Sequence, residues 1–388
     1  MALVDLWKSS PEQINGKTVQ QLLAFAGDGH LRDANETSTE FRSFLGHIPS
    51  GLLQDFAEHC LASSFADGGL ALQDIVNQVG RRLGFQVEDG RYRGVVGEVG
   101  FDGIWRAGEG AAILVEVKTT DAFRLSLDTT ARYRRALIKQ ESIPEESSSI
   151  LYVVGRSDTG DLEAQVRGSR HAWDIRIIGI RALFRVLKIK EELEDQNTVD
   201  RIRAILRPQE FTRVDGIIDL VFSATKEVTP EEIEEPDDEE EEKPATKFTP
   251  VQFRDECVGR LQKYLGESLV KQTAAAYATP DGKTAVLCAI SREYENRNNK
   301  GYWFAFHPSQ QAFLETYSKA FVTFGCGSEN TILVIPFEKF VTWLPLFNKT
   351  VLENRFYWHV RIIRTGDVFQ LNTTRDHDDV VVSEFLIH

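Results

Sequence analysis

Three charged residues lie inside two segments that otherwise predict buried β-strands. Residues 113–118 alternate around β-branched side chains but end with Glu116 and Lys118, and the apolar residues 99–105 contain Asp102. Residues two apart on a strand project from the same face, so Glu116 and Lys118 should lie side by side. Burying such charges costs several kcal/mol unless they are paired or bind a metal ion. The fold must therefore bring these residues to each other or to a cation.

The stretch between the two segments, residues 106–110, contains two glycines and predicts a hairpin turn. Such a hairpin would bring Asp102 beside Glu116. The two carboxylates and the backbone carbonyl of Val117 would supply the hard oxygen ligands that Mg²⁺ prefers, with coordination sites left for water and a phosphate. Lys118 would orient the attacking water or help to deprotonate it. The pattern thus predicts metal-assisted hydrolysis of a phosphodiester.

Asp102, followed after a hairpin by Glu116-Val117-Lys118, resembles the signature of the PD-(D/E)xK nuclease superfamily, although Phe101 stands where the name-giving proline would be. The resemblance covers only the N-terminal half of the chain. It implies an α/β fold with a restriction-endonuclease-like αβββαβ core and a mixed sheet. It also implies a Mg²⁺-dependent endodeoxyribonuclease that accepts Mn²⁺, with Asp102, Glu116 and Lys118 as catalytic residues and Asp102, Glu116 and Val117 as metal ligands.

The order of the predicted elements agrees with that core. Apolar residues recur at helical spacing in residues 70–83, and Gly84-Phe85 suits a C-cap and the entry to a strand. After Lys118 the sequence predicts a basic helix, two strands and a further helix, over residues 128–140, 150–154, 174–179 and 180–190. The crossover through the basic helix implies parallel pairing of residues 113–118 with residues 150–154.

Members of this superfamily often carry a further acidic residue on the first helix, where this chain has Gln73 and Asp74. The resemblance therefore adds Gln73 as a catalytic residue that binds metal-coordinated water, and Asp74 as a metal ligand. For Asp74, an ordinary polar helix face is the alternative interpretation. Thr119, directly after the signature, would contact a phosphate or serve simply as a strand residue.

Positive charge is concentrated after the predicted catalytic strand. Five arginines there are candidates for contacts with the phosphate backbone of DNA: Arg132, Arg134, Arg135, Arg167 and Arg170. The alternative is that some of them lie only on solvated helix faces. The formal net charge of the chain, -14, does not oppose DNA binding, because residues 226–245 alone contain eleven acidic residues and two lysines.

This acidic run divides the chain. We expect a helical N-terminal extension over residues 1–67, the nuclease domain over 68–225, a disordered acidic linker over 226–247 and an α+β recognition or assembly domain over 248–388. The linker would compete with DNA for the basic face or act as a solvated spacer. The last domain is predicted to have strands at residues 284–290, 301–306, 320–324, 331–335, 357–363 and 368–371. Its aromatic residues would stack on bases or form its core: Tyr302, Trp303, Phe304, Phe306, Tyr357 and Trp358.

Residues 1–27 contain no evident signal peptide or membrane-spanning stretch, and the four cysteines lack paired spacing, so we expect a cytoplasmic protein with no membrane partner. The predicted function is DNA cleavage in restriction or anti-phage (antiviral) defence. The enzyme would act as a dimer or higher homo-oligomer, with a partner such as an ATPase or methyltransferase. The alternatives are a catalytically silent nucleic-acid-binding or assembly protein, a repair or RNA nuclease, and an unrelated domain in which Glu116 and Lys118 form a structural salt bridge.

Overall fold

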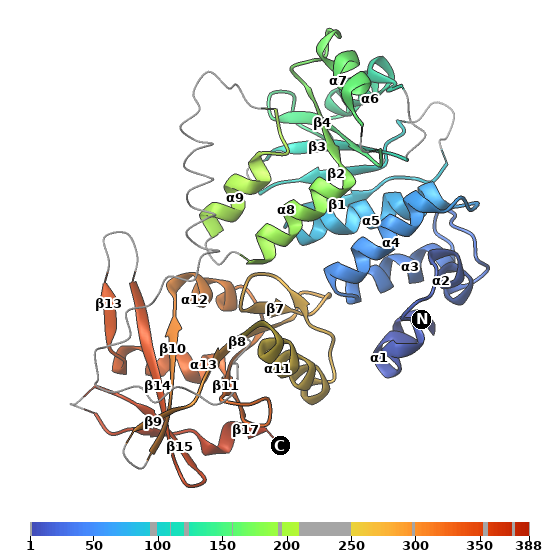
Figure 1. Ribbon diagram of the computed structural model, residues 1–388. Helices are drawn as coiled ribbons and strands as arrows, with labels where there is room; N and C mark the ends of the chain where they lie inside the picture. Colours follow the sequence, from blue (N-terminus) through green and yellow to red (C-terminus); the bar gives the residue numbers. More distant parts are fainter. Residues whose placement is uncertain are drawn as a thin grey trace. The chain divides into compact units, whose positions relative to one another are not determined.

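The chain forms two compact units, Met1–Val228 and Thr229–His388, in the computed structural model (Figure 1). The structure describes residues 2–93, 99–108, 110–119, 124–156, 158–192, 196–208, 250–296, 299–351, 356–374 and 377–387. Both units combine helices with β-sheets, so the fold belongs to the α/β class. The predicted acidic linker, residues 226–247, lies outside the described residues.

One mixed five-stranded sheet organises the first unit, in the order β1-β2-β3-β4-β5. Its strands are β1 (Gln86–Asp89), β2 (Gly103–Arg106), β3 (Ala112–Lys118), β4 (Ser148–Val154) and β5 (Ile175–Gly179). Strands β1, β2 and β3 are antiparallel neighbours, whereas β3, β4 and β5 are parallel. The predicted hairpin between β2 and β3 and the predicted parallel pairing of β3 with β4 are therefore confirmed.

Helices cover both faces of this sheet. On one face α5 (Gly68–Arg82) and α8 (Ile180–Glu192) pack against Trp105, Val115 and Val153. On the other face α6 (Leu127–Lys139) and α7 (Gly160–Arg167) pack against Leu114 and Tyr152. Figure 1 shows the two pairs of helices on opposite sides of the strands, and α9 (Gln196–Ala204) follows α8. Strand β3 is thus buried on both faces until its last two residues.

Helix α5 lies directly against the sheet because it presents apolar side chains and a glycine to it. Leu72 and Ile75 are completely buried. A Cβ atom at Gly80 would lie 2.5 Å from Cε2 of Trp105, so only glycine lets the helix approach the indole this closely. The helix ends near the predicted position, and Gly84 follows with φ +87°, a conformation that glycine adopts without strain.

The helices that precede α5 share its hydrophobic core. They are α1 (Ala2–Ser9), α2 (Val19–Ala26), α3 (Glu36–His47) and α4 (Ser50–Ala62), with a short 3-10 helix at Pro11–Gln13. Their apolar side chains join those of α5 and α8 in one cluster. Glu40 on α3 accepts hydrogen bonds from the backbone N–H groups of Leu3 and Val4 at 2.7 and 3.0 Å, which satisfies donors at the start of α1. The expected N-terminal extension is therefore packed on the rest of the first unit.

The second unit contains two six-stranded sheets and the helix α11 (Pro250–Leu265). One sheet has the order β17-β12-β11-β8-β7-β6, with β6 (Val270–Lys271), β7 (Ala276–Ala278), β8 (Thr284–Ser291), β11 (Lys319–Cys326), β12 (Ile332–Pro336) and β17 (Leu386–Ile387). The other has the order β16-β15-β14-β10-β9, with β13 also paired to β14. Its strands are β9 (Tyr294–Asn296), β10 (Asn299–Phe306), β13 (Lys349–Val351), β14 (Phe356–Thr365), β15 (Val368–Asn372) and β16 (Val380–Val381). All the strands predicted for this unit are present.

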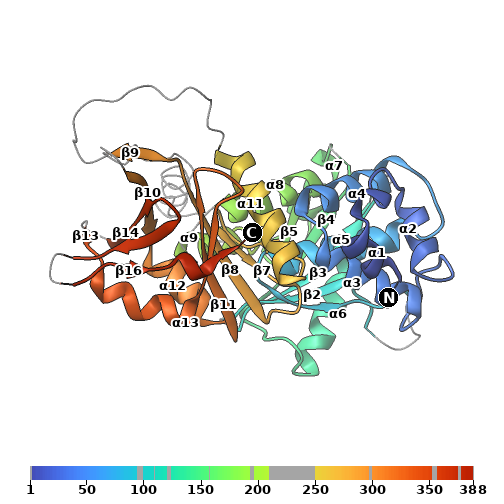
Figure 2. The same ribbon diagram turned by 90° about the horizontal axis from the view of Figure 1, so that it is seen from below.

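The helices of the second unit pack on the sheet that contains β8. Helix α11 and the short helices α12 (Pro308–Glu315) and α13 (Phe337–Phe340) contact β8, β11 or β12, and the 3-10 helices Val341–Leu346 and Ser383–Phe385 complete the unit. Figures 1 and 2 show α11 and β14 on opposite sides of β8. The larger core of the unit lies between the two sheets.

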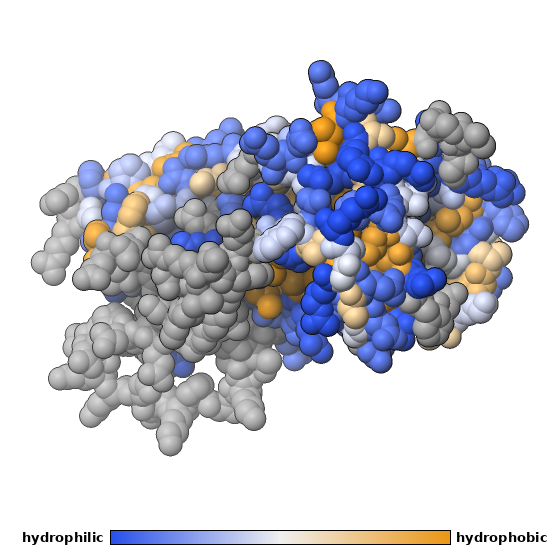
Figure 3. Space-filling model, turned by 90° about the horizontal axis from the view of Figure 1, so that it is seen from above, coloured by the Kyte–Doolittle hydropathy of each residue, from blue (hydrophilic) through white to orange (hydrophobic). Residues whose placement is uncertain are grey.

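In the coloured part of the face drawn in Figure 3, hydrophilic side chains predominate and hydrophobic residues form patches between them. Apolar side chains are gathered in the interior clusters of the two units. No described helix has both the length and the apolar sequence that a membrane crossing requires.

Replacing Gly80 with alanine tests the close packing of α5 on the sheet. The added Cβ atom would overlap the Trp105 ring, so Gly80→Ala should lower the free energy of unfolding by about 1–3 kcal/mol in urea denaturation. Gly51 on α4 is the matched control, since a Cβ atom there meets nothing within 4 Å. Gly51→Ala should leave stability unchanged or raise it. Equal effects of the two substitutions would contradict the packing.

Candidate metal centre

The hairpin of β2 and β3 brings the three predicted signature residues together. Asp102 directly precedes β2, and its backbone N–H donates to the carbonyl of Val115 on β3 at 3.2 Å. Its carboxylate oxygen Oδ2 accepts a hydrogen bond from the N–H of Val117 at 2.7 Å. Lys118 Nζ donates to Glu116 Oε2 at 2.9 Å, as expected for side chains on one strand face. Two carboxylates and an ammonium thus meet at the ends of adjacent strands.

Helix α5 fixes the backbone of Asp102. The carbonyl oxygen of Asp102 accepts hydrogen bonds from Gln73 Nε2 at 3.1 Å, from Asn77 Nδ2 at 2.8 Å and from the N–H of Gly90 at 3.0 Å. Gln73 and Asn77 are one helical turn apart and both are buried. Because these three donors surround one carbonyl, the position of the Asp102 carboxylate depends on the packing of α5.

Asn77 is a site residue that the sequence reasoning missed. Its Oδ1 atom accepts a hydrogen bond from Trp105 Nε1 at 3.0 Å, so the amide links the Trp105 indole to the Asp102 carbonyl. A Cβ atom at Gly103 would lie 2.2 Å from Asn77 Oδ1, which explains the glycine directly after Asp102. The available signal was a second amide one turn after Gln73 on an otherwise apolar helix face.

The backbone carbonyl of Val117 faces the same side as Asp102. In an extended strand, the N–H and C=O of one residue point to the same neighbour. The N–H of Val117 donates to Asp102 Oδ2, whereas the last pair of β2 with β3 is Gly103 with Val115. The Val117 carbonyl therefore lies beyond the paired part of β2, on the side where the predicted ligand is needed.

Burial destabilises the charged forms of both carboxylates, and the charge of Asp102 adds to this effect at Glu116. Glu116 is 9% exposed. Burial raises the pKa of Asp102, against the charge of Lys118 and the hydrogen bond from Val117, which lower it. Burial raises the pKa of Glu116, and so does the charge of Asp102, against the ion pair with Lys118. Burial alone would lower the pKa of Lys118, but the charges of Glu116 and Asp102 and the hydrogen bond to Glu116 raise it. Lys118 is thus held as an ammonium beside two acids that a further cation would stabilise.

A cavity of about 400 Å³ opens at these residues. It is lined by the start of α5, by Asp102 and by the end of β3: Gly69, Leu70, Gln73, Asp102, Val117, Lys118 and Thr119. Of the predicted catalytic residues, Gln73, Asp102 and Lys118 therefore border one space. Glu116 is not among the lining residues, but it is connected to them by its hydrogen bond with Lys118.

Asp74 lies in a different environment. Its Oδ1 accepts from Arg42 Nε at 2.8 Å and its Oδ2 from the hydroxyl of Tyr92. Burial raises the pKa of Asp74 to about 7, against the charge of Arg42. The predicted ligand Asp74 is thus turned from α5 towards α3 and the Tyr92 segment, and it does not line the cavity at Asp102. Within the part of the chain that the structure describes, no group of three or more His, Cys, Asp or Glu side chains could hold a metal ion.

The predicted DNA-contact arginines differ in how they are held. Arg134 is engaged within the fold, because it pairs with Asp174 at 3.3 Å and donates to the Ser148 carbonyl at 2.8 Å. The other four side chains are exposed: Arg132, Arg135, Arg167 and Arg170. Arg132, Arg135 and Arg167 can reach a phosphate from these positions, whereas Arg170 would first have to release the carboxylate of Asp128.

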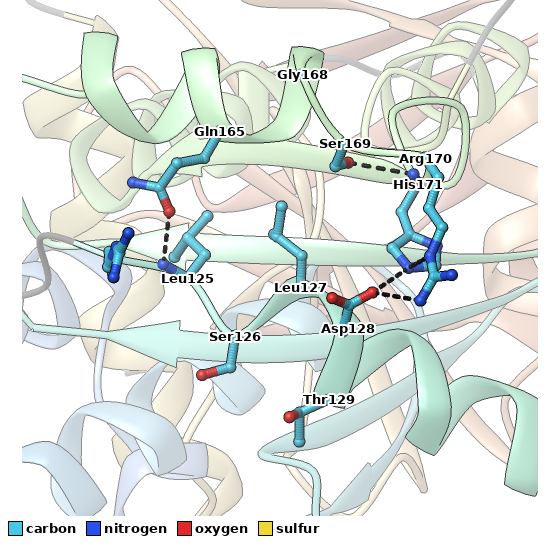
Figure 4. Close-up of a pocket in the computed structure, with 11 residues that line it drawn as sticks. Leu125, Ser126, Leu127, Asp128, Thr129, Gln165, Gly168, Ser169, Arg170 and His171 are labelled. Atoms are coloured by element: carbon cyan, nitrogen blue, oxygen red, sulfur yellow. Dashed lines mark hydrogen bonds and ion pairs between the residues drawn. The ribbon is translucent and has the colours of Figure 1, made fainter.

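Arg170 lines a second cavity, of about 520 Å³, which shares no lining residue with the first. Figure 4 shows Arg170 and His171 converging on Asp128, at the start of α6. Arg170 Nη2 lies 2.8 Å and His171 Nε2 3.0 Å from Asp128 Oδ1. The carboxylate of Asp128 thus already occupies the place where these two groups would hold an anion.

The chain matches no model of a known protein family, and a search of curated proteins gave no significant match.

Removing the Asp102 charge should stabilise the metal-free protein. The folded state keeps a proton on a carboxyl with a raised pKa more tightly than the unfolded state, so stability falls as pH rises above the ordinary value of about 4. In EDTA, Asp102→Asn should therefore unfold at higher urea concentration than the wild type at pH 8, and the difference should shrink towards pH 4.

The matched control is Asp128→Asn. Hydrogen bonds from Arg170 and His171 lower the pKa of Asp128, so removal of its charge should not stabilise the protein at pH 8. If Asp102→Asn destabilised the metal-free protein at pH 8, the two buried carboxylates would not be in electrostatic conflict.

Proposed function

We propose that the chain is a Mg²⁺-dependent nuclease of the PD-(D/E)xK type that hydrolyses phosphodiester bonds of DNA. The observation that carries this proposal is the cluster of Asp102, Glu116 and Lys118 on the β2–β3 hairpin, beside a cavity that Asp102 and Lys118 line. A structural salt bridge requires only Glu116 and Lys118. The additional buried carboxylate of Asp102 raises the electrostatic cost of the cluster, and a cation site explains why it is present.

The donor atoms suit a divalent cation. Within the described residues, Asp102 Oδ1 and Glu116 Oε1 receive no hydrogen bond, while the other oxygen of each is held by Val117 or Lys118. Together with the Val117 carbonyl, they form the set of oxygen ligands that Mg²⁺ takes from proteins. Mg²⁺ bound by Asp102, Glu116 and Val117 would stabilise the negative charge that develops on the phosphoryl group.

Lys118 contributes a positive charge at the cavity wall. Because its pKa is raised by Glu116 and Asp102, it is protonated at neutral pH and can donate hydrogen bonds but not accept a proton. It is therefore suited to orient a water or a phosphate oxygen. Deprotonation of water by Lys118 would first require loss of its ion pair with Glu116.

Gln73 and Thr119 complete the cavity. Gln73 Nε2 donates to the Asp102 carbonyl, so its first role is to hold Asp102, and its side chain also borders the space where a water would lie. Thr119 follows Lys118 at the edge of the same cavity, where a phosphate oxygen of the substrate would lie.

The arrangement of elements supports a restriction-endonuclease-like core. Helix α5, the antiparallel strands β1, β2 and β3, helix α6 and the parallel strand β4 follow one another in the αβββαβ order, and β3 lies in the middle of the sheet. In this proposal Arg132, Arg135, Arg167 and Arg170 contact the DNA backbone. The enzyme would act as an oligomer in restriction or anti-phage defence, with or without an ATPase or methyltransferase partner.

Cleavage of supercoiled plasmid at low salt tests the site. With Mg²⁺ or Mn²⁺ the wild type should nick or linearise the plasmid, and EDTA should abolish this. Lys118→Ala should reduce the rate by at least about 100-fold, because it removes a charge that stabilises the transition state. Lys8→Ala is the matched control, since Lys8 is an exposed lysine on α1, a helix that carries none of the proposed site or DNA-contact residues. It should cleave at nearly the wild-type rate.

A folded wild type that cleaves neither plasmid, single-stranded DNA nor RNA would overturn the enzymatic proposal. Thermal stabilisation by Mg²⁺ that depends on Asp102 but occurs without cleavage would instead indicate a catalytically silent relative.

A further inference from the structure

The sheet that contains β10, β14 and β15 has one buried and one open face. Side chains along these strands alternate between buried and half-exposed or exposed positions. Tyr302, Phe304 and Trp358 point inwards and belong to the core between the two sheets. The opposite side, which we call the outer face, carries Trp303, Tyr357 and His359. The predicted aromatic set is thus divided by strand parity between core and surface.

The described helices of the second unit pack mainly on the other sheet. Helices α11, α12 and α13 contact β8, β11 or β12. Figures 1 and 2 agree that β14 lies on the far side of β8 from α11. The outer face is therefore not the main packing surface of the described helices, and only the ring of His307, at the start of α12, is recorded in contact with it, 5.6 Å from that of Tyr357.

Aromatic rings on the outer face form a connected group. Trp303 Nε1 donates to His359 Nδ1 at 3.1 Å, and His359 Nε2 lies 2.6 Å from Thr350 Oγ1. The ring of Tyr357 lies 5.0 Å from that of His359 and 6.4 Å from that of Trp303, measured between centroids. These hydrogen bonds fix the orientation of the Trp303 and His359 rings, and Tyr357 is held beside them by ring contacts alone.

The outer face has no acidic side chain at the outward positions of its three longest strands, although the whole chain is strongly acidic. These positions read Gly-Trp-Ala on β10, Tyr-His-Arg-Ile-Thr on β14 and Val-Gln-Asn on β15. Arg361, in the centre, is exposed and lies opposite Trp303. At the edge of the sheet, the guanidinium of Arg292 lies 4.8 Å from the ring centre of Tyr294. Burial, and then the charge of Arg361, lower the pKa of His359, so this ring is neutral at pH 7.

We propose that the outer face binds single-stranded DNA, with unpaired bases stacked on Trp303, Tyr357 and His359 and phosphate held by Arg361. Ring stacking requires bases whose flat faces are free, which a duplex does not offer, and the amide of Gln370 can hydrogen-bond a base edge. A protein partner would need an acidic surface to match Arg361 but would leave the group of three rings without a specific function. This binding surface is separate from the proposed metal centre and does not depend on cleavage there.

Fluorescence anisotropy of labelled oligo(dT) with the full chain in EDTA tests the proposal. The wild type should bind oligo(dT), and this binding should quench tryptophan fluorescence. Arg361→Glu should weaken oligo(dT) binding by about tenfold or more, because it replaces a phosphate contact with a repulsive charge. Tyr357→Ala should weaken it by about fivefold or more, because it removes one base stack. Lys283→Glu reverses an exposed charge in the turn before β8 and should leave the affinity unchanged.

Arg361 is exposed, so its substitution keeps the test valid even if Tyr357→Ala impairs folding. Arg361→Glu should leave binding of the duplex unchanged, which separates this surface from the duplex-binding arginines of the proposed nuclease. Insensitivity of oligo(dT) binding to Arg361→Glu, an equal loss of duplex binding, or tighter binding of oligo(U) than of oligo(dT) would each overturn the proposal. So would a dimer that Arg361→Glu dissociates and that binds no oligo(dT).

Discussion

The hydrogen bonds to the backbone carbonyl of Asp102 join helix α5, the segment after β1 and the β2–β3 hairpin at one oxygen atom. Donors from α5 and from the segment after β1 meet at this one oxygen, and the same residue pairs through its N–H with β3. A helix, a hairpin and a loop are thus joined at the residue that carries the first carboxylate. Because all three elements are otherwise packed through apolar side chains, the site inherits the rigidity of the core.

This rigid packing keeps the carboxylates of Asp102 and Glu116 close together although their negative charges repel each other. Asp102 and Glu116 are buried close together with only Lys118 to compensate, and burial raises the pKa of both acids. An isolated charge cluster of this kind would favour local opening, but β3 is paired on both sides and covered on both faces. The free-energy cost of burying these two carboxylates is therefore offset by the packing of the whole unit, as is common at functional sites.

The element order of the first unit could be predicted because hydrophobic periodicity and turn residues are local signals. The pairing of Asp102 with β3 followed from the hairpin, and the proximity of Glu116 and Lys118 followed from strand parity. The partners of Asp74 could not be predicted in the same way, since Arg42 lies on α3 and contacts it only through tertiary packing. Asn77 was missed because its role depends on a carbonyl and an indole from another element. In the second unit the strands were predictable, and parity alone would have separated Trp303 from its inward neighbours.

The hydrogen bond from Val117 N–H to Asp102 Oδ2 would also limit which cations the proposed metal centre can bind. With one carboxylate oxygen held by the backbone, Asp102 can offer a cation only the other, and Lys118 restricts Glu116 in the same way. Large cations such as Ca²⁺ draw on bidentate carboxylates to reach high coordination numbers, whereas Mg²⁺ takes single oxygens and keeps several waters. In the proposed cation site, a main-chain hydrogen bond would thus favour small ions over large ones without any change in the ligand side chains.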